Sequence, residues 1–99
     1  MTTNQSDAVR EWLIEEFSGL EAEVPRIDAL NVVKFKVGDY RGSRYWLAVS
    51  DEFFTSYQSR EEIRGQLTTR GVGRDLRTHE RQWRLLPRVG PLQAWSPVE

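Results

Sequence analysis

Apolar residues recur at helical spacing near the start of the chain, at Val9, Trp12, Leu13 and Phe17. Steps of three and four place these side chains on one side of a helix, because a helical turn takes about 3.6 residues. Ser6 and Asp7 are suited to cap such a helix, and Gly19 is suited to end it. The pattern predicts a helix over residues 7–18.

The period then changes to two, where apolar side chains alternate with two lysines: Val33, Phe35 and Val37 against Lys34 and Lys36. Such alternation is typical of a strand with one face in water. A run that is apolar on both sides follows, and turn residues separate the two segments. We therefore expect an antiparallel hairpin of strands 32–37 and 44–50. The segment 51–57 fits either a short third strand or a helical turn.

Two further helices are predicted in the second half. Ser59 and Glu62 form a Ser-x-x-Glu capping box, which predicts a helix over 60–70 that ends at Gly71. Pro87 would end another helix, over 74–86. That helix is indicated by residues recurring at steps of four and three: Val72, Leu76, His79, Trp83 and Leu86.

These elements predict one α+β domain over residues 1–99, because a second core would be too small to hold in a chain of this length. Two or three antiparallel strands would pack against three helices. We expect a flexible N-terminus (1–5) and a Pro-rich C-terminal tail (88–99) that docks through Leu92 and Trp95. No cysteine is present, so disulfides and thiolate metal sites are excluded.

Six arginines are spaced so that a helix would align them on one side. The steps between them are four, three, four, three and four, and residues at these steps are neighbours on a helix. Guanidinium groups bind carboxylates and phosphates through a planar fork, so the stripe predicts a binding surface for an anionic partner. Its members are Arg70, Arg74, Arg77, Arg81, Arg84 and Arg88.

The charges are segregated along the chain, although the net charge is only -1. Residues 1–59 hold ten acidic and six basic side chains, whereas residues 60–90 hold four acidic and eight basic ones, all of them arginine. Arginine-rich, lysine-poor usage also follows from a GC-rich, bacterial-like genome, which explains the choice of residue but not the spacing.

Three interpretations of the stripe stay open. The arginines can form a solvated face balanced by nearby carboxylates. They can contact another acidic protein or the chain's own acidic first half. They can also bind nucleic acid through phosphate contacts, although a pI near 5.9 is low for a dedicated nucleic-acid-binding domain. The leading hypothesis is a non-enzymatic protein-interaction module, and the alternative is a nucleic-acid-binding accessory protein.

A second group of aromatic and basic residues surrounds the predicted hairpin: Tyr40, Arg41, Arg44, Tyr45 and Trp46. Aromatic rings on a sheet can stack on bases, and arginines beside them can pair with phosphates. The other interpretation is that Tyr45 and Trp46 belong to the core of the sheet, while Arg41 and Arg44 are solvated near the turn. If helices cover only one side of the sheet, an apolar patch remains, and a homodimer would hide it.

No motif indicates catalysis, a metal or another cofactor. His79 and Glu80 begin a zinc-protease pattern, but Trp83 stands where the second histidine is needed. Gly71 and Gly73 lack the Gly-Lys-Ser/Thr ending of a phosphate loop and predict a turn between helices. No apolar stretch is long enough to span a membrane, and the polar start has no signal-peptide pattern, so we expect a soluble, cytoplasmic protein.

Overall fold

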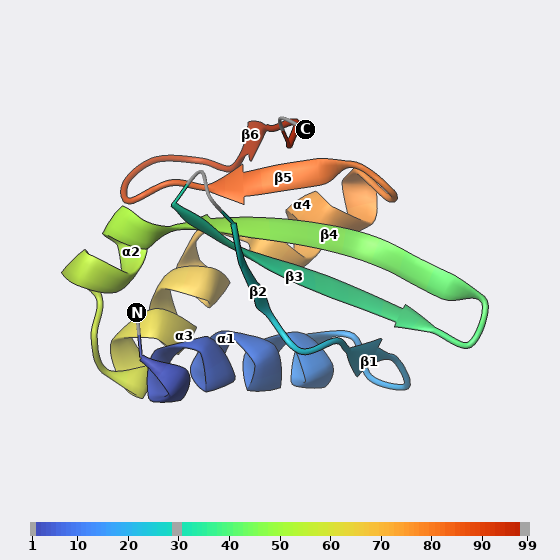
Figure 1. The fold of residues 1–99 in the computed structure, drawn as a ribbon, viewed down its shortest axis with the longest axis horizontal. Coiled ribbons are helices and arrows are strands. Elements are labelled where there is room, and N and C mark those ends of the chain that lie inside the picture. Colours follow the sequence, from blue (N-terminus) through green and yellow to red (C-terminus); the bar gives the residue numbers. More distant parts are fainter. Residues whose placement is uncertain (1, 29–30, 98–99) are drawn as a thin grey trace.

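The computed structural model describes residues 2–28 and 31–97, in which helices and strands share one α+β domain (Figure 1). The described strands form one six-stranded sheet in the order β1-β3-β4-β5-β6, with β2 pairing with β3 beside β1. The fold class is the expected one, but the expected sheet of two or three strands is too small. The elements in chain order are α1 (Thr3–Glu16), β1 (Glu21–Ala22), β2 (Arg26–Asp28), β3 (Val32–Asp39), β4 (Gly42–Ser50), α2 (Asp51–Ser56), α3 (Arg60–Thr69), α4 (Val72–Thr78), β5 (Trp83–Leu86) and β6 (Gln93–Ala94).

Helix α1 begins earlier than predicted. Thr2 is its N-cap, because the Thr2 hydroxyl accepts the Gln5 backbone N–H at 3.2 Å while Gln5 Oε1 accepts the Thr2 N–H at 2.9 Å. The Gln5 side-chain amide also donates to the backbone carbonyls of Phe54 and Tyr57, at 2.7 and 3.1 Å. The first helical turn therefore lies within the segment 1–5, which was expected to be flexible.

The antiparallel hairpin of β3 and β4 is confirmed, and both strands are longer than predicted. The register pairs Phe35 with Leu47 and Lys36 with Trp46, and it shifts between Val37 and Gly38. In an antiparallel pair of strands, two residues that lie directly opposite each other point to the same face of the sheet.

Strands β1 and β2 lie between α1 and β3, where no strand was predicted. Both pair antiparallel with β3, so Ala22 lies opposite Val37 and Arg26 lies opposite Lys34. Pro25 stands between the two strands and has no N–H to offer to a ladder. Such short edge strands carry no alternating pattern, so their pairing depends on the neighbouring strand.

Helix α2 decides between the strand and the helical turn that were both open for 51–57, and α3 confirms the helix predicted over 60–70. Residues 51–56 form helix α2, and Tyr57 is its C-cap. The Ser50 hydroxyl caps its N-terminus by accepting the Glu52 N–H at 3.3 Å. The predicted cap of α3 is present, with the Ser59 hydroxyl accepting the Glu62 N–H at 3.1 Å. No helix in the described residues is long and apolar enough to cross a membrane.

The predicted helix over 74–86 is wrong in its second half. Helix α4 ends at Thr78, and the chain then reverses through a turn in which Arg81 has a left-handed φ of 59°. Strand β5 follows and runs parallel to β4, with Trp83 beside Trp46. Val72 and Leu76 of α4 and Leu86 of β5 are buried in the core, whereas Trp83 lies outside it. The helical spacing of these residues therefore does not come from one continuous helix.

The C-terminal segment packs on the domain as expected. Leu92 is buried in the core, and β6 pairs with β5 so that Gln93 lies opposite Leu85. Trp95 continues this edge, because its backbone N–H donates to the Trp83 carbonyl at 3.2 Å. Much of the predicted tail is therefore part of the sheet and its core.

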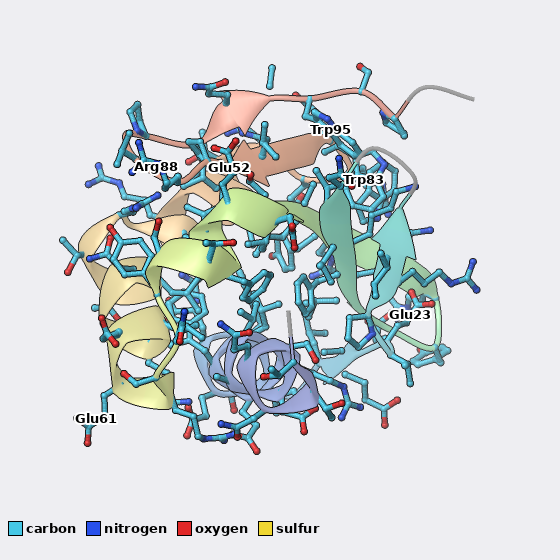
Figure 2. The ribbon with its side chains drawn as sticks, turned by 60° about the vertical axis from the view of Figure 1, so that its left-hand side comes forward. Glu23, Glu52, Glu61, Trp83, Arg88 and Trp95 are labelled. Atoms are coloured by element: carbon cyan, nitrogen blue, oxygen red, sulfur yellow. The ribbon has the colours of Figure 1, made fainter. Side chains whose placement is uncertain are left out.

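Within residues 2–28 and 31–97, the helices cover one face of the sheet (Figure 1). The core cluster contains alternate residues of the two central strands, among them Val33, Phe35, Leu47 and Val49, together with the apolar residues of α1, α3 and α4. Figure 2 shows Trp83 and Trp95 together on the side of the sheet away from α1 and α3. The opposite face of the described sheet carries no helix (Figure 1).

Candidate binding surface on the open face of the sheet

The structure distributes the predicted arginine stripe over several elements. Arg70 is the C-cap of α3, Arg74 and Arg77 lie on α4, and Arg84 lies on β5. Arg81 lies in the turn before β5, and Arg88 follows β5. The six residues therefore do not form one helical face.

Arg70 joins the end of α3 to the segment after β5. Its guanidinium donates to the backbone carbonyls of Pro87 and Arg88 and to Gln66 Oε1, the last at 3.0 Å. The same group lies over the ring of Phe53, 5.4 Å from the centroid. These contacts give Arg70 an internal structural role.

Two more arginines of the stripe bind the chain's own carboxyl and carbonyl groups. Arg77 donates to Glu16 Oε1 and to the Glu16 carbonyl, both at 2.8 Å, which satisfies a carbonyl at the end of α1. Arg84 donates to both oxygens of Asp75, at 2.8 and 3.2 Å. Two arginines outside the stripe join α3 to α1, through the ion pairs of Arg60 with Glu11 and of Arg64 with Glu15.

Besides Arg77, three arginines of the stripe are exposed: Arg74, Arg81 and Arg88. They come from a helix, a turn and a loop, so they share no element. Among the ion pairs between α1 and the arginine-rich second half, the one that involves the stripe joins Arg77 to Glu16.

The hairpin group is also divided. Tyr40 is 90% exposed at the turn, and the Arg41 guanidinium lies 5.4 Å from the centre of its ring. Tyr45 belongs to the core and stacks on Phe17 with ring centres 4.2 Å apart. Arg44 lies near the start of β4, and its Nε is 3.9 Å from a carboxylate oxygen of Glu80. Trp46 is the member that faces the open side of the sheet.

A row of side chains crosses the open face from β3 to the segment after β6. Lys36 lies opposite Trp46, Trp46 lies beside Trp83, and Trp95 follows on the next chain segment. These positions lie between those that supply the core, so the row points away from α1. The structure thereby brings together three tryptophans that lie far apart in sequence.

The three indole rings form a row across the sheet, in which Trp83 contacts both Trp46 and Trp95. Trp46 and Trp83 have ring centres 5.7 Å apart and an interplanar angle of 40°. Trp83 and Trp95 meet edge to face, with centres 5.6 Å apart at 84°. All three rings are half-buried, and the Trp46 indole N–H donates to the Ser43 hydroxyl at 2.9 Å. The aromatic cluster is therefore a continuous, partly exposed surface.

Cationic side chains border this cluster. The ammonium groups of Lys34 and Lys36 lie 5.6 and 5.9 Å from the centre of the Trp83 ring, which is within the range of cation–π attraction. Arg26 lies opposite Lys34 on β2, and its side chain is exposed. We call Lys34, Lys36, Arg26 and the three tryptophans the Trp–Lys face.

Two hollows meet at Trp83. One is lined by Lys34, Lys36, Arg26 and Trp83, with Glu23 as its acidic member. The other, of about 390 Å³, is lined by the three tryptophans of the cluster and by Arg81. Trp83 therefore separates a cationic hollow from an aromatic one that has its own cation.

No three His, Cys, Asp or Glu side chains of residues 2–28 and 31–97 gather where they could hold a metal ion. His79 is half-buried at the end of α4, with Nδ1 3.0 Å from the Asp75 carbonyl oxygen. This contact holds the His79 ring against the helix that it ends.

Sequence reasoning named Trp46 as a candidate contact and placed Lys34 and Lys36 on the wet face of a strand, but it did not connect Trp83, Trp95 and Arg26 with them. Trp83 was assigned to the core side of a helix, and Trp95 was expected to dock as part of a tail. The alternation of Lys34 and Lys36 in a strand with one wet face was the signal that marked this side of the sheet.

No protein-family model, curated protein or solved structure matches the chain. The assignment of the candidate surface therefore rests on the geometry of these residues alone.

Proposed function

We propose that this protein is a non-enzymatic interaction module that binds an acidic protein partner through the Trp–Lys face. The observation that carries the proposal is the row of Lys36, Trp46, Trp83 and Trp95 across the uncovered side of the sheet. Tryptophan is enriched among the residues that dominate binding energy at protein interfaces. A partly exposed aromatic cluster on a sheet is thus suited to a partner surface.

The charges around the cluster favour an acidic partner. Three basic side chains, Lys34, Lys36 and Arg26, line the hollow beside Trp83, whereas Glu23 is the one acidic residue among its lining residues. Arg81 adds a further cation on the other side of the ring. Complementary charges of this kind raise association rates and select among partners.

This proposal changes the role of the arginine stripe. Arg81 keeps the binding role predicted for it, because it lines the aromatic hollow. Arg70, Arg77 and Arg84 contribute through the internal contacts described above. Arg74 and Arg88 are exposed away from the residues that line the two hollows, and we assign them to solubility.

The test follows the indole N–H signals of isotope-labelled protein during titration with a decaglutamate peptide at low salt. We expect the signals of Trp46, Trp83 and Trp95 to shift. The Trp12 signal is an internal control, because its N–H donates to Thr68 Oγ1 between α1 and α3, on the other face of the sheet. Equal shifts of all four signals, or none, would contradict the proposal.

A pair of charge reversals tests the role of the cations. Arg26→Glu combined with Lys36→Glu should abolish the decaglutamate shifts, since both side chains are exposed on the face. Arg74→Glu is the matched control, because it reverses an exposed charge on α4. Loss of binding in the control variant would place the surface elsewhere.

A second candidate function is binding of single-stranded nucleic acid. It is favoured by the same combination of indoles and cations on a sheet, since bases stack on aromatic rings while basic side chains meet phosphates. The ring of Trp83 already carries two ammonium groups near its face, which is why we rank this function second. Indole shifts with mixed-sequence single-stranded DNA, but none with decaglutamate, would reverse the ranking.

A homodimer through this face is the remaining way to cover the cluster. Two identical cationic faces would repel each other, which disfavours it. If it forms, the indole signals of the free protein will depend on protein concentration, and sedimentation will give twice the mass of the 11.6 kDa chain.

A further inference from the structure

We infer that the partner binds the Trp–Lys face as a short extended segment in which one aromatic side chain stands between two acidic residues, each two positions away. This inference rests on the proposed function and specifies the partner's chemistry. It follows from the order of groups along the face: cations, the Trp83 ring, the aromatic hollow and Arg81.

The aromatic hollow defines the central residue. Trp46, Trp83 and Trp95 line it together with Gln82, Ala94 and Ser96, and its volume of about 390 Å³ leaves room for an aromatic side chain. Aromatic pairs favour edge-to-face and offset contacts at centre distances of about 4.5–7 Å. Trp83 and Trp95 meet each other edge to face at 84°, so an inserted phenyl ring would pack beside this pair.

The cations define the acidic positions and their spacing. Lys34 and Lys36 place their ammonium groups 5.6 and 5.9 Å from the centre of Trp83. In an extended chain, side chains on the same side are two residues and roughly 6.6–7 Å apart. A carboxylate two positions from the aromatic residue therefore reaches these ammonium groups while the ring occupies the hollow.

Arg81 defines the acidic position on the other side. It lines the aromatic hollow, whereas the two lysines line the neighbouring one, with Trp83 between them. Its backbone N–H is fixed by a hydrogen bond of 2.8 Å to the Arg44 carbonyl, and its side chain is exposed. A second carboxylate on the far side of the anchor thus meets a guanidinium group held beside the hollow.

Three synthetic peptides test the inference by titration of the indole signals at low salt. The first contains glutamate–serine–phenylalanine–serine–glutamate flanked by glycine and serine. The second has alanine in place of phenylalanine, and the third has glutamine in place of both glutamates. We expect the first to bind about tenfold more tightly than the second, because burying a phenyl ring contributes roughly that factor, and the third to bind most weakly.

The outcomes separate the inference from the proposed function. Equal binding of the first two peptides overturns the aromatic anchor and leaves an acidic-partner module intact. Equal binding of the first and third overturns the paired acidic positions. If neither acidic peptide shifts the indoles of the face, the inference and the proposed function both fail.

Arg81→Asn tests the second acidic position without disturbing the turn, because asparagine tolerates the left-handed φ of 59° at this residue. We expect about threefold weaker binding of the first peptide, the effect of one exposed ion pair. A peptide with a single glutamate, on the amino or carboxyl side of the phenylalanine, identifies which end Arg81 meets. If Arg81→Asn leaves all peptide affinities unchanged, the second acidic position is wrong.

Discussion

Arg84 of β5 donates two hydrogen bonds to the carboxylate of Asp75 on α4, from Nε at 2.8 Å and from a terminal nitrogen at 3.2 Å. The exposed fractions of the two side chains are 11% and 21%. A planar guanidinium is suited to this two-point geometry. The pair fastens the strand that carries Trp83 to a helix on the opposite face, so it supports the Trp–Lys face from behind.

Replacing Arg84 by Met should destabilise the domain by about 2–3 kcal/mol, because the Asp75 carboxylate loses two charge-assisted hydrogen bonds where it is largely shielded from water. Urea unfolding followed by circular dichroism measures this change. Arg60→Met is the control, since the Arg60 pair with Glu11 is much more exposed and should contribute less than about 1 kcal/mol. Equal losses in the two variants would contradict the structural role of Arg84.

Gly38→Ala should destabilise the domain by about 1–3 kcal/mol through overpacking. A Cβ at this position would lie 2.2 Å from the Gly42 carbonyl oxygen and 2.5 Å from Ser43 Cα, which are backbone atoms that cannot move aside cheaply. The register shift of the hairpin lies at this residue. Thermal unfolding of the variant should show the loss.

Gly65→Ala is the matched control for that prediction. Gly65 is exposed inside α3, and a Cβ there meets no atom within 4 Å. Alanine is favoured over glycine in a helix by about 0.5–1 kcal/mol, so this variant should be more stable than the natural chain. Destabilisation by Gly65→Ala would show that α3 does not pack as described.

Leu92→Ala should lower the free energy of unfolding by about 2–3 kcal/mol. The side chain is 7% exposed and packs in the core despite its position near the C-terminus. Val89→Ala, in the same segment, changes a side chain that is 60% exposed and should stay within about 0.5 kcal/mol of the natural chain. Denaturant midpoints of the two variants measure the difference. Similar midpoints would mean that the segment after β5 is not packed.

Arg70→Met should lower the free energy of unfolding of the domain by about 2 kcal/mol. The change removes the donor for the carbonyls of Pro87 and Arg88 and the cation from the ring of Phe53. Arg74→Met is its control, because the Arg74 side chain is exposed on α4. If both variants unfold at the same urea concentration, Arg70 acts as a surface residue, as the original stripe hypothesis has it.

Local patterns in the sequence determined the elements that depend on neighbouring residues. The Ser-x-x-Glu motif at Ser59 and Glu62 identified the start of α3, and the alternation in 32–37 identified β3 and its wet face. Helical spacing identified most of α1, although its cap at Thr2 lay outside the apolar pattern. These features act over a few residues, so the order of side chains along the chain is sufficient to specify them.

Tertiary structure decided the segment from His79 to Trp95. Its apolar and arginine spacings fit a helix, yet a strand there can pair with β4, bury Leu86 in the core and satisfy Arg84 with Asp75. Pairing between distant strands depends on backbone hydrogen bonds and on burial shared with the neighbouring strand. The spacing of apolar residues along the sequence does not specify which strands pair. The same pairing places Trp46, Trp83 and Trp95 side by side, so the sequence by itself supplied the tryptophans and the lysines, while the sheet assembled them into one face.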